Sequence, residues 1–405
     1  MGRRVWQIGP GIAVLACASA LAQNTIQPAS GAIHIFNTDM AVLETQEVRK
    51  DIACTVTPDK PILGFDLRFH AGYEVNVPLR DLAGGENQLT ILFRVTPDNR
   101  KDEPKYFVQH IRVPSIEDDA KGEANLGGAI ELGEGTYHVD WLMRDRGERV
   151  CSFYWDMDAT LAPKDKQIEL AIAAGSIQAV NLEQFTDEPP IERAHPGQPL
   201  NIKVLVNFAP QNSEAAALRP VDTLALVSIL RRIAREPQFG KFSIVAFNMQ
   251  EQRVLYRQKS GDKIDFPALG DAIHSIKLGT VDLKRLSQKH GDTEFLTDLI
   301  KKEMSTEDRP DALVFAGPKV MLDEAVPQET LKPLADVDYP VFYMNYALNP
   351  AAVPWRDSIS RAIRVFKGTE YTISRPRDLW FAMTEMVGRI VRSKHGRAAS
   401  PVSAQ

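Results

Sequence analysis

Two of the three cysteines lie where redox chemistry is possible. Cys54 and Cys151 both occur in segments that alternate apolar and polar residues, and both fall on the apolar side of that alternation. A disulfide between Cys54 and Cys151 is compatible with this placement, and so are two buried free thiols. The third cysteine, Cys17, lies in an apolar N-terminal run.

The remaining reactive residue types form no recognised catalytic pattern. The eight histidines are dispersed, and none is paired with another ligand at a metal-binding spacing. His70 and His138 fall on the polar faces of expected strands, which predicts solvated side chains. The sequence contains no G-x-S-x-G elbow, Walker loop, strand-linked G-x-G-x-x-G or H-E-x-x-H motif. We therefore predict no catalytic residues, no cofactor and no enzymatic activity.

The first 22 residues resemble a signal peptide. Arg3 and Arg4 precede an apolar run at 12–22, which ends in the small-x-small pattern Ala20-Leu21-Ala22. We expect cleavage between Ala22 and Gln23 and an exported protein, periplasmic or secreted. Lipidation at Cys17 is a minor alternative. Removal of the leader leaves only Cys54 and Cys151, and an oxidising compartment favours a disulfide between them.

The composition restricts the choice of partner. The formal net charge is −5, and there is no dense run of Lys and Arg of the kind that binds nucleic-acid phosphates. No later stretch reaches the roughly 18 apolar residues that a membrane span requires. We expect a protein or cell-surface partner, no nucleic acid, and no membrane span once the leader is removed.

The sequence predicts an N-terminal segment at 23–46, followed by a β-rich domain at 47–175. Apolar residues recur at every second position in five segments, and turn residues such as Pro, Asp, Asn and Gly separate these segments. Closely spaced strands without helices between them are typical of an antiparallel, immunoglobulin-like β-sandwich. Cys54 and Cys151 then belong to its first and last core strands.

The pattern changes after a proline-rich linker at 176–200. From 201 to 393, short apolar runs alternate with stretches in which apolar residues recur every three or four positions. This alternation predicts a mostly parallel sheet covered by helices on both sides. The predicted fold class is therefore α+β with two domains, and the last twelve or so residues, 394–405, are predicted to be a disordered tail.

One loop in this second domain suggests a family. The strand Val204-Leu205-Val206 runs directly into a polar loop at 207–214. This order of elements resembles the von Willebrand factor A-type domain, a doubly wound α/β fold. The whole chain resembles the exported "VWFA-related" proteins of acidobacteria, in which a β-rich region precedes such a domain. In that family the loop carries Asp-x-Ser-x-Ser, which holds a metal ion together with a later Thr and Asp.

The resemblance places the family's metal ligands on residues that do not suit a metal. Its Asp falls on Asn207, its two Ser on Ala209 and Gln211, and its later Asp on Gly317; Thr293 alone keeps the matching hydroxyl. Magnesium usually requires at least one carboxylate. Nearby Ser213, Glu214 and Asp292 do not sit in the family's register.

These observations predict an exported, non-enzymatic binding protein with a degenerate, metal-free site and no magnesium. Two alternatives stay open: an exported hydrolase with its site at the strand ends of the second domain, and a metal-dependent adhesion protein.

Overall fold

The computed structural model describes residues 24–26, 35–180, 183–193, 199–212, 215, 217–278, 290–305, 309–322, 324–348 and 357–398. The predicted signal peptide, its cleavage position between Ala22 and Gln23, and Cys17 lie outside these residues. The chain divides into two compact units. Unit 1 comprises residues up to Ile62, Arg68–Ala162 and Leu170–Leu182, and unit 2 comprises Leu63–Leu67, Pro163–Glu169 and the chain from Glu183 onward.

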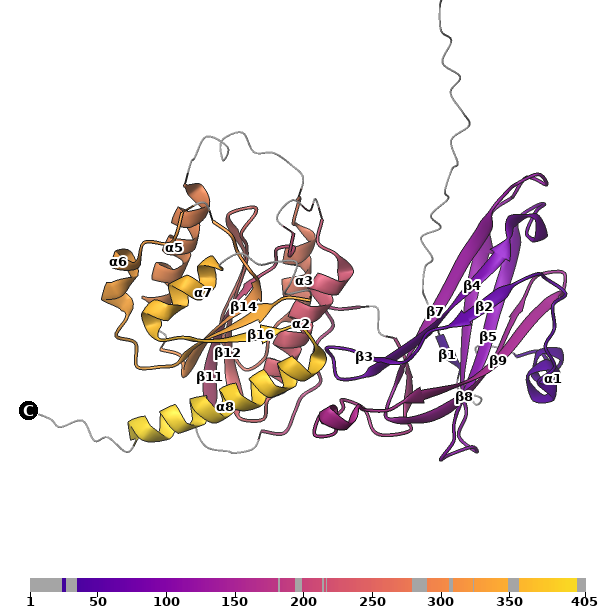
Figure 1. Ribbon diagram of the computed structural model, residues 1–405, viewed down its shortest axis with the longest axis horizontal. Coiled ribbons are helices and arrows are strands. Elements are labelled where there is room, and N and C mark those ends of the chain that lie inside the picture. Colours follow the sequence, from indigo (N-terminus) through magenta and orange to yellow (C-terminus); the bar gives the residue numbers. More distant parts are fainter. Residues whose placement is uncertain are drawn as a thin grey trace, which may run out of the picture. The chain divides into compact units, whose positions relative to one another are not determined.

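Unit 1 contains two antiparallel sheets (Figure 1). The first sheet has the strand order β1 (Asn24–Ile26), β6 (Lys105–Val113), β5 (Asn87–Pro97), β8 (Gly135–Arg144) and β9 (Val150–Ala159). The second has the order β10 (Ile177–Ala179), β7 (Glu123–Leu132), β4 (Phe69–Pro78) and β2 (Thr55–Pro58), with the two-residue β3 (Ile62–Leu63) off this path. The sandwich-like arrangement agrees with the predicted β-rich N-terminal domain.

The core of unit 1 lies between alternating strand residues. Along β4, buried residues occupy every second position, as the sequence pattern predicts. Tyr73 on β4 makes edge-to-face contacts with Phe93 and Trp141, whose ring centroids lie 5.5 and 5.7 Å away. Five alternating segments are expected from the sequence, but β6 and β7 are additional strands. Their alternation is weak because β6 buries three consecutive residues and β7 contains the pair Gly127-Gly128.

Unit 1 also carries a helix on the outer side of the first sheet. Helix α1 (Asn37–Thr45) packs through Leu43, which is fully buried against Leu92, Val108, Leu142 and Val150. The sequence predicts no helix in this N-terminal segment.

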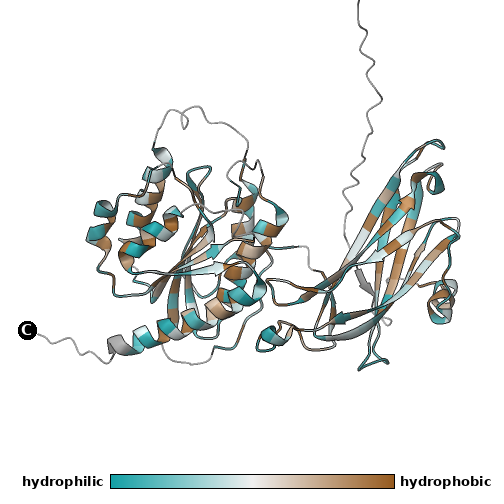
Figure 2. Cartoon of the chain, viewed as in Figure 1, coloured by the Kyte–Doolittle hydropathy of each residue, from teal (hydrophilic) through white to brown (hydrophobic). Residues whose placement is uncertain are grey.

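Unit 2 is built on a six-stranded sheet. Its order is β13 (Arg253–Gly261), β12 (Phe239–Asn248), β11 (Leu200–Asn207), β14 (Ala312–Pro318), β15 (Val341–Tyr346) and β16 (Thr369–Ile373). Figure 2 shows the hydrophobic colouring of these strands beside helices of mixed character. The described helices are α2 (Pro220–Ala234), α3 (Phe266–His274), α5 (Gly291–Met304), α6 (Gln328–Leu331), α7 (Ser358–Ile363) and α8 (Pro376–Ala398).

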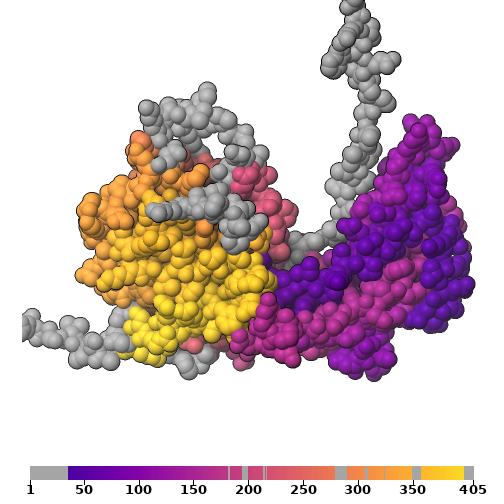
Figure 3. Space-filling model, viewed as in Figure 1, coloured from indigo at the N-terminus to yellow at the C-terminus, as the bar shows by residue number. Residues whose placement is uncertain are grey.

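Two apolar clusters cover the two faces of this sheet. Val204 and Val206 of β11 belong to the cluster that includes α2, α3 and α8, whereas Leu205 belongs to the cluster that includes α5 and α7. In Figure 3, residues 357–398 form much of the visible surface of unit 2. Helix α8 extends to Ala398, so the first part of the predicted disordered tail, 394–405, is helical.

The predicted fold class, α+β with a doubly wound α/β C-terminal domain, is wrong. The chain is mostly β, with 36% strand and 27% helix arranged around three sheets. In the sheet of unit 2, β12 and β13 pair antiparallel. They are joined by a tight turn at residues 249–252 instead of the helical crossover that a parallel pair requires. This antiparallel pair and the two sheets of unit 1 raise the share of strand above that of helix.

Candidate functional site

The sequence-predicted site residues of unit 2 lie mainly at the carboxyl ends of β11 and β14. Asn207 ends β11 and is fully buried, and Ala209 follows it and is also buried. Gly317 lies near the end of the neighbouring strand β14. Thr293 lies in the first turn of α5, and Gln211 lies in the turn after β11.

Asn207 and Gly317 are in direct contact. Gly317 has a φ of 151°, and a Cβ atom added to it would lie 2.8 Å from the Cβ of Asn207. The side chain of Asn207 accepts a hydrogen bond from the backbone N–H of Met249 at 3.1 Å. Its Nδ2 has no hydrogen-bond partner in the part of the chain that is described. Asn207 therefore packs directly against the backbone of Gly317, and little space is left between the two residues.

Gln211 and Thr293 make structural hydrogen bonds elsewhere. Gln211 donates to Asp222 at 2.9 Å and accepts from the backbone N–H of Leu348 at 3.1 Å. Thr293 donates from its hydroxyl to the carbonyl oxygen of Glu324 at 3.0 Å. The structure therefore brings Asn207 and Gly317 together and engages Gln211 and Thr293 in separate contacts. The absence of a metal ion at these positions stays a prediction.

A second buried polar group lies at the same edge of this sheet. Asp357 caps α7, and its Oδ1 accepts from the N–H groups of Val320 and Ile359 at 3.0 and 3.1 Å. Burial raises the pKa of Asp357 to about 6. The hydroxyl of Tyr343 donates to the carbonyl of Pro318 at 3.2 Å, and burial raises the pKa of this phenol as well. These groups are enclosed and have little access to a ligand.

Unit 1 contains a more open polar site, which we call the α1 cleft. It is a cavity of ≈ 500 Å³ beside the C-terminal end of α1. The residues that line it are Gln46, Arg94, Thr96, Asp98, Lys101, Pro104, His138, Asp140 and Asp156.

Strand register places the central residues of the α1 cleft. His138 and Asp140 are two apart on β8 and therefore point to the same side of the sheet. On β9, Asp156 lies directly opposite His138. On β5, Arg94 lies directly opposite Asp140. Three adjacent strands thus supply two carboxylates, an imidazole and a guanidinium at one place.

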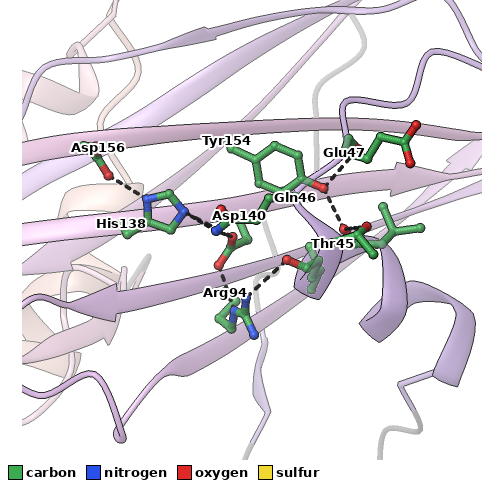
Figure 4. A network of polar contacts seen from close by, with 10 residues as sticks. Thr45, Gln46, Glu47, Arg94, His138, Asp140, Tyr154 and Asp156 are labelled. Carbon is green, nitrogen blue, oxygen red and sulfur yellow. Dashed lines mark hydrogen bonds and ion pairs between the residues drawn. The ribbon is translucent and has the colours of Figure 1, made fainter.

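The polar side chains of the α1 cleft form one hydrogen-bonded network (Figure 4). The imidazole of His138 contacts Asp156 Oδ1 through Nδ1 at 2.6 Å and Asp140 Oδ1 through Nε2 at 3.2 Å. Gln46 Nε2 lies 2.9 Å from His138 Nε2 and 2.9 Å from Asp140 Oδ1. Arg94 Nε donates to Asp140 Oδ2 at 2.8 Å.

The floor of the α1 cleft is a buried ion pair. The side chain of Asp140 is 1% exposed and that of Arg94 is 18% exposed. Burial alone would lower the pKa of Arg94, but its hydrogen bond and ion pair with Asp140 outweigh burial, and the pKa is raised. The ion pair with Asp140 therefore stabilises the charged form of Arg94. Asp156 at the rim is 77% exposed and remains accessible to a ligand.

Sequence reasoning missed the α1 cleft because it treated His138 as a solvated strand residue. The alternation correctly placed His138 on the outer face of β8 and would have placed Asp140 with it. The signal that was available is the pair of acidic residues flanking this face, Asp140 and Asp156. The missing information was α1, which covers Asp140 and turns an exposed carboxylate into a buried one.

A second polar cleft of ≈ 400 Å³ also involves α1. It contains Asp39, whose side chain is nearly buried and forms an ion pair with Arg144 at 3.4 Å. Burial raises the pKa of Asp39. The guanidinium of Arg144 also lies 4.1 Å from the ring centroid of Phe36. These contacts attach the N-terminal half of α1 to the sheet.

The predicted disulfide between Cys54 and Cys151 is present. Its two Cα atoms lie 6.4 Å apart, and it closes a loop with a sequence separation of 97. Residue pairing next to it brings Lys50 beside Cys151 in an antiparallel bridge. The disulfide and this backbone pairing therefore fix the segment that follows α1 to the edge strand β9.

No protein-family model matches the sequence, and no curated protein matches it. Among solved structures, the chain is similar to the PilB minor pilin from Streptococcus sanguinis, with 8% identity over 77% of this chain and 89% of that chain and a TM-score of 0.30. It is similar to a glycosyl hydrolase family 2 member from Bacteroides cellulosilyticus, with 9% identity over 80% of this chain and 39% of that chain and a TM-score of 0.19.

A third similar structure is a β-glucuronidase from Bacteroides uniformis, with 9% identity over 79% of this chain and 39% of that chain and a TM-score of 0.17. TM-scores at this level carry no argument about fold or function.

Proposed function

We propose that this chain is an exported, non-enzymatic binding protein and that the α1 cleft holds a positively charged group of its partner. The observation that carries the proposal is the cleft itself, ≈ 500 Å³ in volume and lined almost wholly by polar side chains. Ligand sites in proteins are generally concave and contain a few convergent polar groups on a rigid scaffold.

The charges of the cleft favour a cation. Its lining contains three carboxylates, from Asp98, Asp140 and Asp156, and two permanent cations, Arg94 and Lys101. Arg94 is already paired with the buried Asp140. Asp98 and Asp156 are exposed at the rim, where a guanidinium or ammonium group can reach them. Opposite charges in such a cleft attract a partner and fix its orientation.

One observation supports export. The Cys54–Cys151 disulfide is compatible with an oxidising compartment outside the cytoplasm. Among the described residues, no helix is both long and apolar enough to cross a membrane. A leader that is cleaved after Ala22 completes this proposal, and it predicts that the mature protein isolated from the periplasm or medium begins at Gln23. Determination of the intact mass and N-terminal peptide of that protein tests it.

Binding is tested by affinity capture from the periplasm or medium of the source organism. The bait is the mature chain, compared with a variant in which Asp98→Asn and Asp156→Asn remove the two rim charges. We expect a partner that the mature chain retains at low salt, and that is lost with the double variant and at high salt.

The matched control replaces exposed acids of unit 1 that lie away from the cleft, Asp118→Asn and Asp119→Asn. This control bait is expected to capture the same partner as the unmodified chain. A partner that binds all three baits equally would show that the α1 cleft is not the binding site. Hydrolysis of the captured partner would instead support the alternative, an exported hydrolase.

A further inference from the structure

Gln46 ends α1 in an unusual backbone conformation. Its φ and ψ angles of 53° and 26° lie in the left-handed region, which disfavours residues other than glycine. Such a conformation persists where surrounding contacts hold it. The contacts here are those of the Gln46 side-chain amide with Asp140 and His138, each at 2.9 Å.

We propose that Gln46, His138 and Asp140 form an acid-operated latch, in which protonation of His138 displaces Gln46 from Asp140 and loosens α1 from the sheet. The proposal goes beyond the proposed function, because it does not depend on what the α1 cleft binds.

The neutral form of His138 satisfies both contacts of the Gln46 amide. Its Nδ1–H donates to Asp156, which leaves Nε2 as an acceptor. One N–H of the Gln46 amide then donates to His138 Nε2, and the other donates to Asp140 Oδ1. The amide must point its nitrogen at this place, because Asp140 can only accept. In this state Gln46 is held by two hydrogen bonds.

The protonated form makes the same arrangement impossible. A second proton on Nε2 turns this nitrogen into a donor that faces the donor Nε2 of Gln46 at 2.9 Å. A rotated Gln46 amide would accept from His138, but its oxygen would then face the carboxylate oxygen of Asp140, also at 2.9 Å. The imidazolium can instead donate directly to Asp140, now 3.2 Å away. Protonation therefore exchanges Gln46 for His138 as the partner of Asp140.

The release of Gln46 affects α1 because that helix has few other attachments. Nine residues are too short for a stable isolated helix. Its apolar contact is centred on Leu43. Near its C-terminal end, Tyr154 Oη donates to the carbonyl of Val42 at 2.8 Å, and Arg94 donates to the carbonyl of Leu43 at 3.3 Å. The chain after Gln46 is fixed to β9 by the Arg49–Ser152 hydrogen bonds, so α1 can move about this point.

Several other charged groups surround the latch. The titratable or charged side chains in and next to the α1 cleft are Asp140 on β8, Asp156 and Tyr154 on β9, Arg94 on β5, and Asp98 and Lys101, which follow β5. At the other end of α1, Asp39 faces Arg144. Protonation of Asp39 would also weaken the attachment of α1, so the test must separate it from His138.

Backbone hydrogen exchange of the full mature chain at pH 8 and pH 5 tests the latch. Histidine side chains ordinarily change charge across this interval. After correction for intrinsic exchange rates, we expect the protection of the α1 amides to fall about tenfold at pH 5, corresponding to the loss of one hydrogen bond. Protection of β8 is expected to stay constant and serves as the measure of an intact fold.

Two variants define the chemistry. His138→Asn cannot gain a proton, and its α1 protection is expected to be the same at both pH values. Gln46→Glu is expected to reverse the direction in which α1 protection changes with pH. Its carboxylate is repelled by Asp140 at pH 8 and attracted by protonated His138 at pH 5, so α1 protection is expected to rise on acidification. His110→Asn, a change at another outward-facing histidine of unit 1, is the control and is expected to behave as the unmodified chain.

Equal α1 protection at pH 8 and pH 5 in the unmodified chain would overturn the latch. A fall that persists in His138→Asn would also overturn it and would assign the effect to Asp39. Failure of Gln46→Glu to reverse the sign would show that Gln46 is only a structural contact.

Discussion

Two polar regions of this molecule differ in how their side chains are satisfied. One is the α1 cleft of unit 1, and the other, which we call the strand-end group, comprises Asn207, Gly317, Tyr343, Asn345 and Asp357 near the carboxyl ends of the strands of unit 2. In the α1 cleft, Asp140 accepts hydrogen bonds from Arg94 and Gln46, and the rim is open to solvent. In the strand-end group, Asn207 Nδ2, Asn345 Oδ1 and Asp357 Oδ2 are buried and have no hydrogen-bond partner among the described residues.

This difference follows from how each region is built. The α1 cleft is assembled by strand register, which places complementary charges opposite each other on adjacent strands. The strand-end group is assembled by close packing of backbone against backbone at Gly317. A network of paired charges supports recognition of a ligand, whereas a packed and partly unsatisfied group mainly limits which residues the fold tolerates.

The largest effect is expected from a substitution that breaks the charge network of the α1 cleft. Arg94→Met leaves Asp140 buried without its ion-pair partner, and removal of one partner of a buried pair typically costs about 3–5 kcal/mol. We expect a loss of unfolding free energy near the lower end, about 3 kcal/mol, because Gln46 and His138 still contact Asp140. Urea unfolding of the mature chain, followed by a probe in unit 1, measures it.

The matched control is Arg112→Met. Arg112 also pairs with an acid, Glu86, but the two side chains are 80% and 60% exposed. Exposed pairs contribute little to stability, so this change is expected to alter the unfolding free energy by less than about 0.5 kcal/mol. Equal losses for Arg94→Met and Arg112→Met would remove the contrast between a buried network and an exposed surface.

The next effect tests close packing in unit 2. Gly317→Ala introduces a Cβ 2.8 Å from the Cβ of Asn207, at a φ of 151° that L-residues rarely adopt. We expect a loss of about 2–3 kcal/mol from overpacking and backbone strain together. Gly388→Ala in the middle of α8 is the control, since its new Cβ meets only Arg392 Nη1 at 3.5 Å. That change is expected to stabilise by about 0.5–1 kcal/mol.

The two glycine changes are compared by thermal and urea unfolding of unit 2. A Gly317→Ala chain as stable as the unmodified one would mean that the strand ends can separate, and the strand-end group would then have room for a ligand.

The third effect is a pH dependence specific to the strand-end group. Asp357 has a pKa of about 6 in the folded chain, raised by burial from an ordinary value of 3.8. A raised pKa means that the folded state binds the proton more tightly than the unfolded state. This stabilisation is complete below about pH 4 and is lost as pH rises through about 6.

Asp357→Asn removes this dependence. The amide oxygen can still accept from the N–H groups of Val320 and Ile359. Between pH 4 and pH 7 the stability of the variant relative to the unmodified chain is expected to rise by up to about 3 kcal/mol, an upper figure because roughly 1.4 kcal/mol corresponds to each pKa unit. Unfolding free energies measured across this range check it; a difference that is constant with pH would show that Asp357 is ionised in the folded chain.

The sequence predicted the two regions unequally. Alternation along the strands predicted the β-rich unit, the inward direction of Cys151 and the outward direction of His138, because a period of two depends only on local chain geometry. It did not predict the burial of Asp140, which depends on α1 covering a strand that is about 100 residues away in sequence. A pattern read from one strand contains no information about such a partner.

The error in fold class has a related cause. Apolar positions spaced by three and four identified α2 and α8 correctly, but the alternation of strands and helices also predicted a mostly parallel, doubly wound sheet for the whole second half. The direct turn between Asn248 and Arg253 has no apolar signature of its own. Likewise, the resemblance predicted that Asn207 and Gly317 are neighbours but did not predict Thr293 donating to Glu324, since that contact depends on the placement of a loop.

The smallest expected effect asks whether Thr293 belongs to the strand-end group at all. Its hydroxyl donates to the carbonyl of Glu324 at 3.0 Å, and the residue is 6% exposed. Thr293→Val keeps the shape and removes the donor, which is expected to cost about 1 kcal/mol because the hydrogen bond to the carbonyl of Glu324 is lost. Thr384→Val is the control, because Thr384 makes its hydrogen bond on the exposed side of α8 and the loss of unfolding free energy is expected to be close to zero.

A double-mutant cycle of Thr293→Val with Asp357→Asn then decides whether Thr293 belongs to the strand-end group. If the two changes add within about 0.5 kcal/mol, Thr293 acts alone as a loop anchor; a larger coupling would place it in one network with Asp357 and make the strand-end group more like the α1 cleft.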